Sequence, residues 1–234
     1  MTHKVHPKIH RTPTVFPWDS RWFATKRDLA NFIEQEVAIR EYIQAKLKDS
    51  GIDAMSIERS PKEMTITILC AKPGVVIGRG GQGLEVIRKH IERQFLQFKL
   101  KAKLHIQAVA QPALSAAIVG QTMASEIERR LPFRRVMKQS IEKVMAAGAQ
   151  GIKINMSGRL NGAEIARREK LSAGKMSLIT LRSHVDYAFV EAFTIYGKIG
   201  IKVWVYHGEA FGRKDKFEKK ADEPTNRKKL EIRK

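Results

Sequence analysis

Residues 73–83 read PGVVIGRGGQG, and this glycine-rich stretch decides how the first half of the chain is expected to fold. The segments around it carry the periodicities of regular structure, helical over residues 25–50 and 84–98 and alternating over residues 53–59, 63–70 and 103–108. In the first helix we expect a single apolar stripe, formed by Leu29, Ile33, Val37, Ile43 and Leu47. The expected order is helix, strand, strand, short helix, glycine loop, helix, strand.

Three interpretations of the glycine loop follow from its spacing. A dinucleotide-binding loop needs an acidic residue about 20 positions downstream, and no Asp or Glu occurs between Glu92 and Glu126. A nucleoside-triphosphate loop needs Gly-Lys-Ser/Thr, which does not follow here. The third interpretation is the GXXG clamp of a KH module, and its alternative is a flexible turn without a ligand. The element order and the basic composition favour the clamp.

This element order is that of the prokaryotic, type II KH fold (αββααβ). Glycines at the loop let the backbone approach a sugar–phosphate chain, and the N–H groups at the start of the next helix face the phosphates. Arg79 adds positive charge there, and Val76 and Ile77 are expected to floor a groove for bases. The candidate RNA-binding residues are Ile77, Gly78, Arg79, Gly80 and Gly81 in the loop, with Arg88 and Lys89 on the following helix.

The charge balance also points to a polyanionic partner. Lys and Arg number 44 against 24 Asp and Glu, which gives a net charge of +20 and a pI near 10.2. No apolar stretch is long enough to cross a bilayer, so we expect no membrane partner. The single cysteine, Cys70, excludes an internal disulfide and a zinc site of several thiolates, and favours a cytoplasmic setting.

No constellation of catalytic or metal-ligating residues is apparent. His3, His6 and His10 have ligand-like spacing but no neighbouring carboxylate or thiolate, so a flexible basic arm is the favoured interpretation. Asp186 and Glu191 are too few for a metal-dependent nuclease. We therefore expect no enzymatic activity, no cofactor and no metal.

The second half of the chain predicts a separate α+β domain. Helical patterns over residues 114–130 and 134–147 are followed by strand patterns over residues 152–156, 163–170, 182–193 and 201–205. Two helices followed by a run of strands favour an antiparallel sheet. We expect an extended arm over residues 1–24, the KH domain over 25–110, the C-terminal domain over 111–210, and a charged, disordered tail over 211–234.

Basic residues of this second domain form the other candidate site. Arg134, Arg135 and Lys138 share one helix face. The two arginines lie in the first turn, where positive charge opposes the helix dipole by about 0.3–1 kcal/mol each. A phosphate chain would compensate for this charge, and a solvated face is an equally weighted alternative. Further candidate RNA contacts are Arg129, Arg130, Arg159, Arg167 and Arg168, and Trp18, Trp22 and Trp204 are candidates for base stacking or for simple anchoring.

Motifs along nearly the whole chain, over about residues 15–210, resemble one family. They include Trp18-Asp19-Ser20-Arg21-Trp22-Phe23-Ala24, the stretch Ala71-Lys72-Pro73-Gly74-Val75-Val76-Ile77-Gly78, Arg134-Arg135-Val136-Met137-Lys138, Ser157-Gly158-Arg159-Leu160 and Gly162-Ala163-Glu164-Ile165-Ala166-Arg167. In this order they resemble the family of protein three of the small ribosomal subunit, in its bacterial or organellar branch. The opening His6-Pro7-Lys8-Ile9-His10-Arg11 lacks the glycine usual after this proline.

The resemblance implies a structural constituent of the subunit head that binds ribosomal RNA and adjoins other head proteins. It implies that Arg134, Arg135 and Lys138 lie at the entrance channel for messenger RNA, beside the proteins of that channel, and aid unwinding of messenger structure without nucleotide hydrolysis. The setting would be the cytoplasm, or an organellar stroma or matrix. One alternative is a free-standing KH regulator of messenger or small RNA, and another is a nucleic-acid-processing enzyme.

Overall fold

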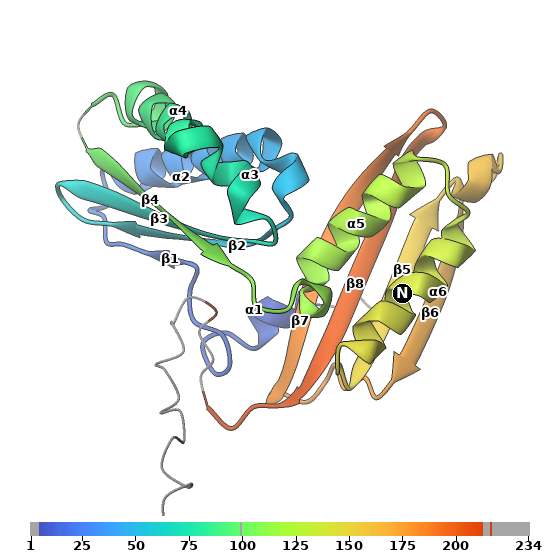
Figure 1. The fold of residues 1–234 in the computed structure, drawn as a ribbon. Coiled ribbons are helices and arrows are strands. Elements are labelled where there is room, and N and C mark those ends of the chain that lie inside the picture. Colours follow the sequence, from blue (N-terminus) through green and yellow to red (C-terminus); the bar gives the residue numbers. More distant parts are fainter. Residues whose placement is uncertain (1–4, 99, 213–215, 217–234) are drawn as a thin grey trace, which may run out of the picture.

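The computed structural model describes residues 5–98, 100–212 and 216. The chain forms two lobes, each built on a four-stranded sheet with helices on one face (Figure 1). None of the helices in these residues is sufficiently long and apolar to span a bilayer. The expected α+β class, with an N-terminal KH domain and a C-terminal domain of helices and an antiparallel sheet, is confirmed.

The first lobe has the expected KH element order. Its elements are α2 (Leu29–Lys46), β2 (Ile52–Arg59), β3 (Glu63–Cys70), α3 (Pro73–Ile77), α4 (Gln82–His90) and β4 (Lys101–Ala108), with β1 (Ser20–Arg21) at one sheet edge and a π-helical turn at Ile91–Phe95. Strand β3 pairs antiparallel with β2 and parallel with β4. Its alternating side chains Met64, Ile66 and Ile68 are buried, and they join Ile39, Ile43, Ile87 and Ile91 of the helices in one core.

The expected apolar stripe on α2 is buried only in its C-terminal part. Ile39, Ile43 and Leu47 are buried, whereas Leu29, Ile33 and Val37 are 43%, 48% and 48% exposed. An α-helix turns about 100° per residue, so the exposed set is centred roughly 80° around the helix from the buried set. The two sets therefore lie on adjoining sides of the helix, and only the buried set meets the sheet.

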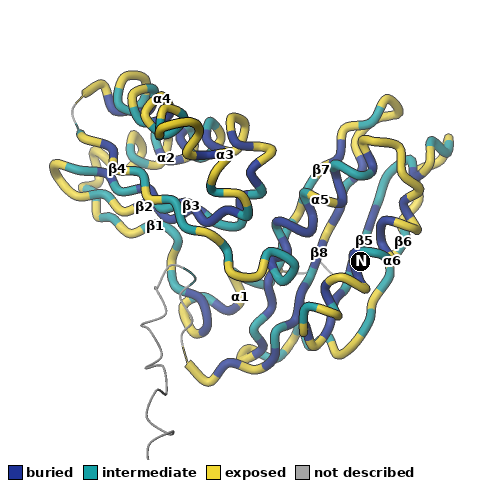
Figure 2. Tube along the Cα trace, in the orientation of Figure 1, coloured by how far each residue is buried: buried dark blue, intermediate teal, exposed yellow. Residues whose placement is uncertain are grey.

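The second lobe is an antiparallel sheet in the order β6-β5-β8-β7, with α5 (Ala116–Glu128) and α6 (Phe133–Ala146) packed on one face. Its strands are β5 (Gly151–Gly158), β6 (Arg167–Gly174), β7 (Ser183–Thr194) and β8 (Gly197–Glu209). Figure 1 shows the two helices side by side in front of the strands. In Figure 2 the outer surface of α4 is largely exposed, whereas β8 is buried over much of its length.

One strand boundary differs from the expectation over residues 163–170. Strand β6 starts at Arg167, because Gly158 at the end of β5 pairs with that residue. The connection contains a short turn, Leu160–Gly162, in which Asn161 and Gly162 have φ of 55° and 75°. Residues 163–166 therefore belong to the connection.

The described part of the N-terminal arm is not extended. It contains the short helix α1 (Pro7–His10), which contacts β7. Arg11 is fully buried, and its guanidinium donates hydrogen bonds to the carbonyl oxygens of Pro7 (2.9 Å), Leu178 (2.7 Å) and Thr180 (3.0 Å). A buried cation needs such acceptors, so this bonding fixes the arm to the second lobe. Of the tail, only residues 211, 212 and 216 are described, so its expected disorder lies outside the described residues, as does His3.

A buried carboxylate ties the arm to the first lobe. Glu36 of α2 accepts hydrogen bonds from Ser20, from Trp22 Nε1 (2.6 Å) and from Arg40 (2.7 Å). Burial alone would raise the pKa of Glu36, but these donors and the Arg40 charge hold that pKa below its ordinary value. Trp22 is therefore an anchor of the arm, which was one of the two expectations for it.

Candidate RNA-binding surfaces

The glycine loop consists of a tight turn between two helices. Gly78, with φ of 70°, directly follows helix α3, and Gly81, with φ of 79°, directly precedes α4. Gly80 between them has φ of 60°. All three lie in the left-handed half of conformational space, where glycine is favoured because it has no Cβ. The turn thus places α4 directly after the loop, with its first N–H groups at the loop.

The glycines of the loop region have two different surroundings. A Cβ at Gly83 would lie 2.9 Å from the Val76 carbonyl oxygen, and one at Gly78 would lie 3.2 Å from the Gly83 nitrogen. These two glycines allow α3 and α4 to meet backbone to backbone. A Cβ at Gly80 or Gly81 would meet no described atom within 4 Å. The backbone at these two positions is consequently open to an approaching ligand.

The side chains around the loop divide between core and surface. Ile77 is 39% exposed and Arg79 is exposed, as a groove floor and a phosphate contact would require. Val76, which was expected in the same floor, is buried in the core at 1% exposure. It faces inward because α3 is a helix, in which neighbouring residues point about 100° apart. The expected groove floor is therefore corrected to Ile77 without Val76.

Arg88 and Lys89 project from α4 next to a carboxylate. The Arg88 guanidinium lies 3.7 Å and the Lys89 ammonium 3.6 Å from the carboxylate of Glu85. All three side chains are at least 42% exposed, so these pairs contribute at most about 1 kcal/mol. A phosphate can therefore reach both cations if it displaces the weakly bound Glu85 carboxylate.

Helix α6 presents three cations on its exposed side. Arg134, Arg135 and Lys138 are exposed, whereas the other side of the helix is buried in the lobe's core through Phe133, Val136, Met137 and Val144. No acidic residue lies in its first turn. The Arg134 guanidinium is 3.2 Å from Glu169 of β6, and 72% of its side chain remains exposed. The buried side of the helix makes it a rigid support for the three charges.

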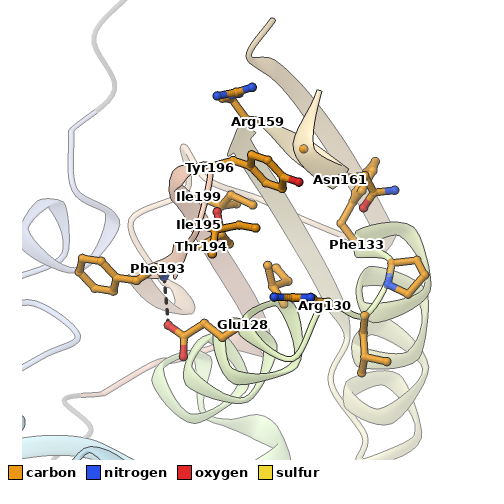
Figure 3. Close-up of a pocket in the computed structure, with 14 residues that line it drawn as sticks. Glu128, Arg130, Phe133, Arg159, Asn161, Phe193, Thr194, Ile195, Tyr196 and Ile199 are labelled. Atoms are coloured by element: carbon orange, nitrogen blue, oxygen red, sulfur yellow. Dashed lines mark hydrogen bonds between the residues drawn. The ribbon is translucent and has the colours of Figure 1, made fainter. Parts of the chain in front are cut away.

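Two of the other candidate arginines meet at a cleft of about 390 Å³ (Figure 3). Arg130, with φ of 65°, and Arg159 lie at its rim, while Phe133, Ile195, Tyr196 and others line it. Arg159 Nε donates to the Ala163 carbonyl oxygen (2.8 Å), and its guanidinium lies 5.4 Å from the centre of the Tyr196 ring. The cleft is therefore lined by apolar side chains together with two arginines and with the polar residues Glu128, Asn161 and Thr194.

The remaining candidates do not join this cleft. Arg129 is exposed at the end of α5. Arg167 and Arg168 are consecutive residues of β6, and neighbouring strand residues point to opposite faces of a sheet. The basic residues thus form several separate surfaces. Within the described ranges, no three His, Cys, Asp or Glu side chains gather as a metal site would require.

Lys153, Lys170 and Lys202 were not among the site residues predicted from the sequence. They lie on the sheet face turned away from α5 and α6. The alternation of apolar and basic residues in β5 and β8 is the pattern that could have identified them.

Comparison with known proteins agrees with both lobes. Residues 38–114 match the family described as KH domain, and residues 123–205 match the family described as Ribosomal protein S3, C-terminal domain. The chain is 46% identical over 209 residues to the small ribosomal subunit protein uS3 of Desulforamulus reducens, with 89% of this chain and 93% of that protein covered. It is 44% identical over 214 residues to the uS3 protein of Shouchella clausii, with 92% and 96% covered.

A third relative extends the match further along this chain. The uS3 protein of Xanthomonas campestris pv. campestris strain 8004 is 43% identical over 223 residues, which cover 95% of this chain and 90% of that protein. Identity at this level over both lobes exceeds what a shared fold alone would give. The chain therefore belongs to the family of the small ribosomal subunit protein uS3.

Proposed function

We propose that the chain, as an RNA-binding structural constituent of the small ribosomal subunit, helps form the messenger RNA entrance channel through α6. The observation that carries this proposal is the exposed trio Arg134, Arg135 and Lys138 on a helix whose other side is buried. Membership in a ribosomal protein family agrees with the expectation that the chain is not an enzyme. The partners we propose are ribosomal RNA, messenger RNA, the neighbouring head proteins and the proteins of the channel, in the cytoplasm.

The electrostatics of α6 support a phosphate partner. Positive charges near a helix N-terminus oppose its dipole, at about 0.3–1 kcal/mol each. Only Glu169 pairs with the trio among the described residues, through Arg134. A passing phosphate chain supplies the missing negative charge. Without such a partner, the unfavourable interaction between these charges and the helix dipole remains. A solvated face without a ligand is therefore the less favourable alternative.

The geometry of the trio suits strand separation without hydrolysis. Arg134 and Lys138 are four residues apart, which is roughly 6 Å along the helix. Because α6 is fixed to the sheet, the three charges stay in place while a messenger RNA duplex moves past them. Charges that hold the backbone of an unpaired strand lower the free energy of the unpaired state relative to the duplex, and so favour opening at the channel.

The glycine loop is proposed as a second RNA contact. Gly80 and Gly81 leave the backbone open, and Arg79 adds an exposed cation. Arg88 and Lys89 extend the positive surface along α4, and Ile77 offers an apolar edge for a base. Arg129, Arg130, Arg159, Arg167 and Arg168 remain proposed ribosomal RNA contacts.

A reconstituted translation system tests the α6 proposal. Arg134→Ala, Arg135→Ala and Lys138→Ala are combined in one chain, and passage through a messenger with a stable hairpin is timed against an unstructured messenger. We expect normal incorporation into subunits and slower passage through the hairpin alone. The matched control removes the same charge from the first lobe, with Lys62→Ala, Lys101→Ala and Lys103→Ala. Equal hairpin passage for the two triple variants would refute the assignment of α6 to the channel.

A gradient experiment separates this proposal from the free-standing KH regulator. A tagged copy of the chain is sedimented from lysate at low and at moderate salt. Comigration with the small subunit at both salt concentrations supports a built-in constituent. A chain that stays at the top of the gradient with short RNAs bound would favour the regulator.

A further inference from the structure

The face of the second sheet that points away from α5 and α6 carries basic and aromatic side chains that belong to none of the surfaces described above. Ile152, Ile154 and Met156 of β5 point into the core, so the intervening Lys153 and Asn155 point to the opposite face. Among the described helices, α5 and α6 pack on the core face. Helix α1 lies against β7, where the His6 ring at its N-cap is 4.7 Å from the ring of Tyr187 at the edge of the opposite face. The opposite face is named the lysine face and comprises Lys153, Asn155, Lys170, Phe189, Lys202 and Trp204.

Strand register places these residues in two adjacent rows across the sheet. In one row, Asn155 pairs with Lys170 of β6 and with Lys202 of β8, and Lys202 pairs with Phe189 of β7. In the next row, Lys153 pairs with Trp204. Neighbouring strands are about 4.8 Å apart, so Lys170 and Lys202 begin roughly 10 Å from each other. Basic and aromatic side chains therefore alternate over one continuous surface.

The aromatic rings of this face lie close to the sheet. A Cβ at Gly200 would be 3.2 Å from Phe189 Cε2, so the Phe189 ring crosses over this glycine, and the residue is 52% exposed. The Lys202 ammonium lies 5.7 Å from the centre of that ring. The Trp204 ring is held by Tyr187 at 5.2 Å and has the Lys153 ammonium 5.5 Å from its centre. Each of the two rings therefore has a lysine ammonium over it, which a phosphate could draw away.

The charge of the face is strongly one-sided. Among the described residues of β7, the alternation of side chains places one carboxylate, that of Glu191, on this face. It is paired with the Lys198 ammonium at 3.0 Å. Lys153, Lys170 and Lys202, together with Arg168 at the next position of the same face, are all basic. Basic side chains interleaved with exposed aromatic rings are the composition of surfaces that bind single-stranded nucleic acid, since phosphates pair with the cations and bases stack on the rings.

We propose that the lysine face binds an unpaired segment of ribosomal RNA. Its backbone runs over Lys170, Lys202 and Lys153, and its bases stack on Phe189 and Trp204. An unpaired segment is favoured over a duplex because a duplex hides the faces of its bases. A protein partner would need an acidic surface complementary to four cations, whereas RNA carries this charge throughout. The inference rests on the proposed RNA-binding function, but it requires neither the glycine loop nor α6, which packs on the other side of the sheet.

The first test uses the full chain with the other two proposed sites disabled. Arg79→Asp and Gly80→Asp place negative charge in the loop, and Arg134, Arg135 and Lys138 are changed to Ala. Binding of a fluorescein-labelled, unstructured RNA oligonucleotide is followed by anisotropy over a range of salt concentrations. We expect this background protein to bind, and to prefer the single strand over a duplex of the same sequence. Loss of all binding, or equal binding of the duplex, overturns the inference.

Variants on the face then test its two components in this background. Phe189→Leu keeps an apolar side chain over Gly200 but removes the stacking plane, and should weaken binding roughly 5- to 150-fold. Lys170→Ala with Lys202→Ala should lower the slope of log affinity against log salt by about 1.4, or about 0.7 for each phosphate contact. The control, Lys101→Ala with Lys103→Ala, removes the same charge from the other lobe. Face variants that behave like this control, with unchanged thermal unfolding, overturn the inference.

The second test uses assembled subunits. A benzophenone amino acid at position 189 is irradiated in purified small subunits, and the cross-linked product is digested with ribonuclease or with protease. We expect a product that ribonuclease shortens. Cross-linking to a neighbouring protein, or no cross-link at all, overturns the inference. Neither result affects the α6 proposal, because hairpin passage is measured independently of this face.

Discussion

Lys216 joins the two lobes, and its replacement by Met is expected to destabilise the chain. Its ammonium lies 3.1 Å from the Asp53 carboxylate of β2 and 3.3 Å from the Asp186 carboxylate of β7. Asp53 also accepts a hydrogen bond from Ser115, and Asp186 accepts one from the Ala116 N–H at 2.9 Å. One side chain of the tail thus pairs with two carboxylates at the N-terminus of α5, where the lobes meet.

The expected cost follows from the burial of the group. Side-chain exposure is 28% for Lys216, 6% for Asp53 and 12% for Asp186. Removal of one partner from a buried ion pair costs about 3–5 kcal/mol, because the other charge is left uncompensated. Because Lys216 is partly exposed, we expect Lys216→Met to cost about 3 kcal/mol, near the lower limit of this range. For a chain of this size such a loss lowers Tm by roughly 6–12 °C.

Urea unfolding at pH 7, followed by tryptophan fluorescence, measures this cost. The control is Lys103→Met, because Lys103 pairs with Glu63 at 2.6 Å but the two side chains are 53% and 41% exposed. We expect the control to lose less than about 1 kcal/mol. Adding Asp53→Asn to Lys216→Met should recover part of the loss, since one uncompensated charge disappears. A Lys216→Met chain within about 0.5 kcal/mol of the control, which is the size expected of an ordinary surface change, would refute the reasoning.

The same cluster predicts a pH dependence. Burial alone would raise the pKa of Asp186, but Lys216, the Ala116 N–H and His207 hold that pKa below its ordinary value of 3.8. The stability it contributes is present above that value and is lost as the pH falls through the lowered pKa. Burial alone would lower the pKa of Lys216, but the two carboxylates raise that pKa above 10.5. The stability that the Lys216 ammonium contributes is therefore lost only as the pH rises through the raised pKa. The difference between wild type and Lys216→Met should therefore be constant across neutral pH.

Three further changes have distinct expected outcomes. Arg11→Met removes four hydrogen bonds to carbonyl oxygens, including a longer one to Ser177 at 3.5 Å, and should cost about 2–4 kcal/mol in urea unfolding. More rapid proteolysis of the arm should accompany this loss, and an unchanged stability would contradict the anchoring role. Gly83→Ala places a Cβ 2.9 Å from a carbonyl oxygen and should lower stability by about 1–3 kcal/mol. Gly74→Ala, where α3 leaves open space, should raise stability by about 0.4–1 kcal/mol. Equal effects of the two changes would contradict the close packing of α3 and α4. Glu36→Gln should lower stability by about 1–3 kcal/mol at pH 7. Because the pKa of Glu36 is lowered from 4.5, this difference in stability should shrink as the pH falls through the lowered pKa. A difference independent of pH would contradict the charged state of Glu36.

The order of elements was predictable because it depends on local patterns. Alternation in residues 63–70 corresponds to β3, and the glycines of residues 73–83 correspond to a turn whose three positive φ angles need them. The exposed side of α6 also followed from its periodicity. The roles of the candidate RNA-binding residues stay predictions, to be decided by the experiments above.

Other features could not be read from local patterns. The apolar residues at the start of α2 have helical spacing, and only the position of the sheet shows that they lie outside the core. The lysine face combines β5, β6, β7 and β8. Alternation within β5 and β8 marks individual lysines, but only the pairing of the strands brings them together on one face. The cleft at Arg130 and Arg159 likewise needs three separate segments.

Local patterns along the chain were sufficient to predict the two-lobe α+β organisation, the KH order and the basic character of the protein. These depend on residues a few positions apart, whose spacing fixes hydrogen bonding and the buried side of each element. The anchoring of Arg11 and the bridge at Lys216 depend instead on long-range contacts of the folded chain. Their partners are 167 and 169 residues away for Arg11, and 163 and 30 residues away for Lys216. A charge becomes a structural anchor only when the fold removes it from water and supplies its partners, and no local spacing specifies that environment.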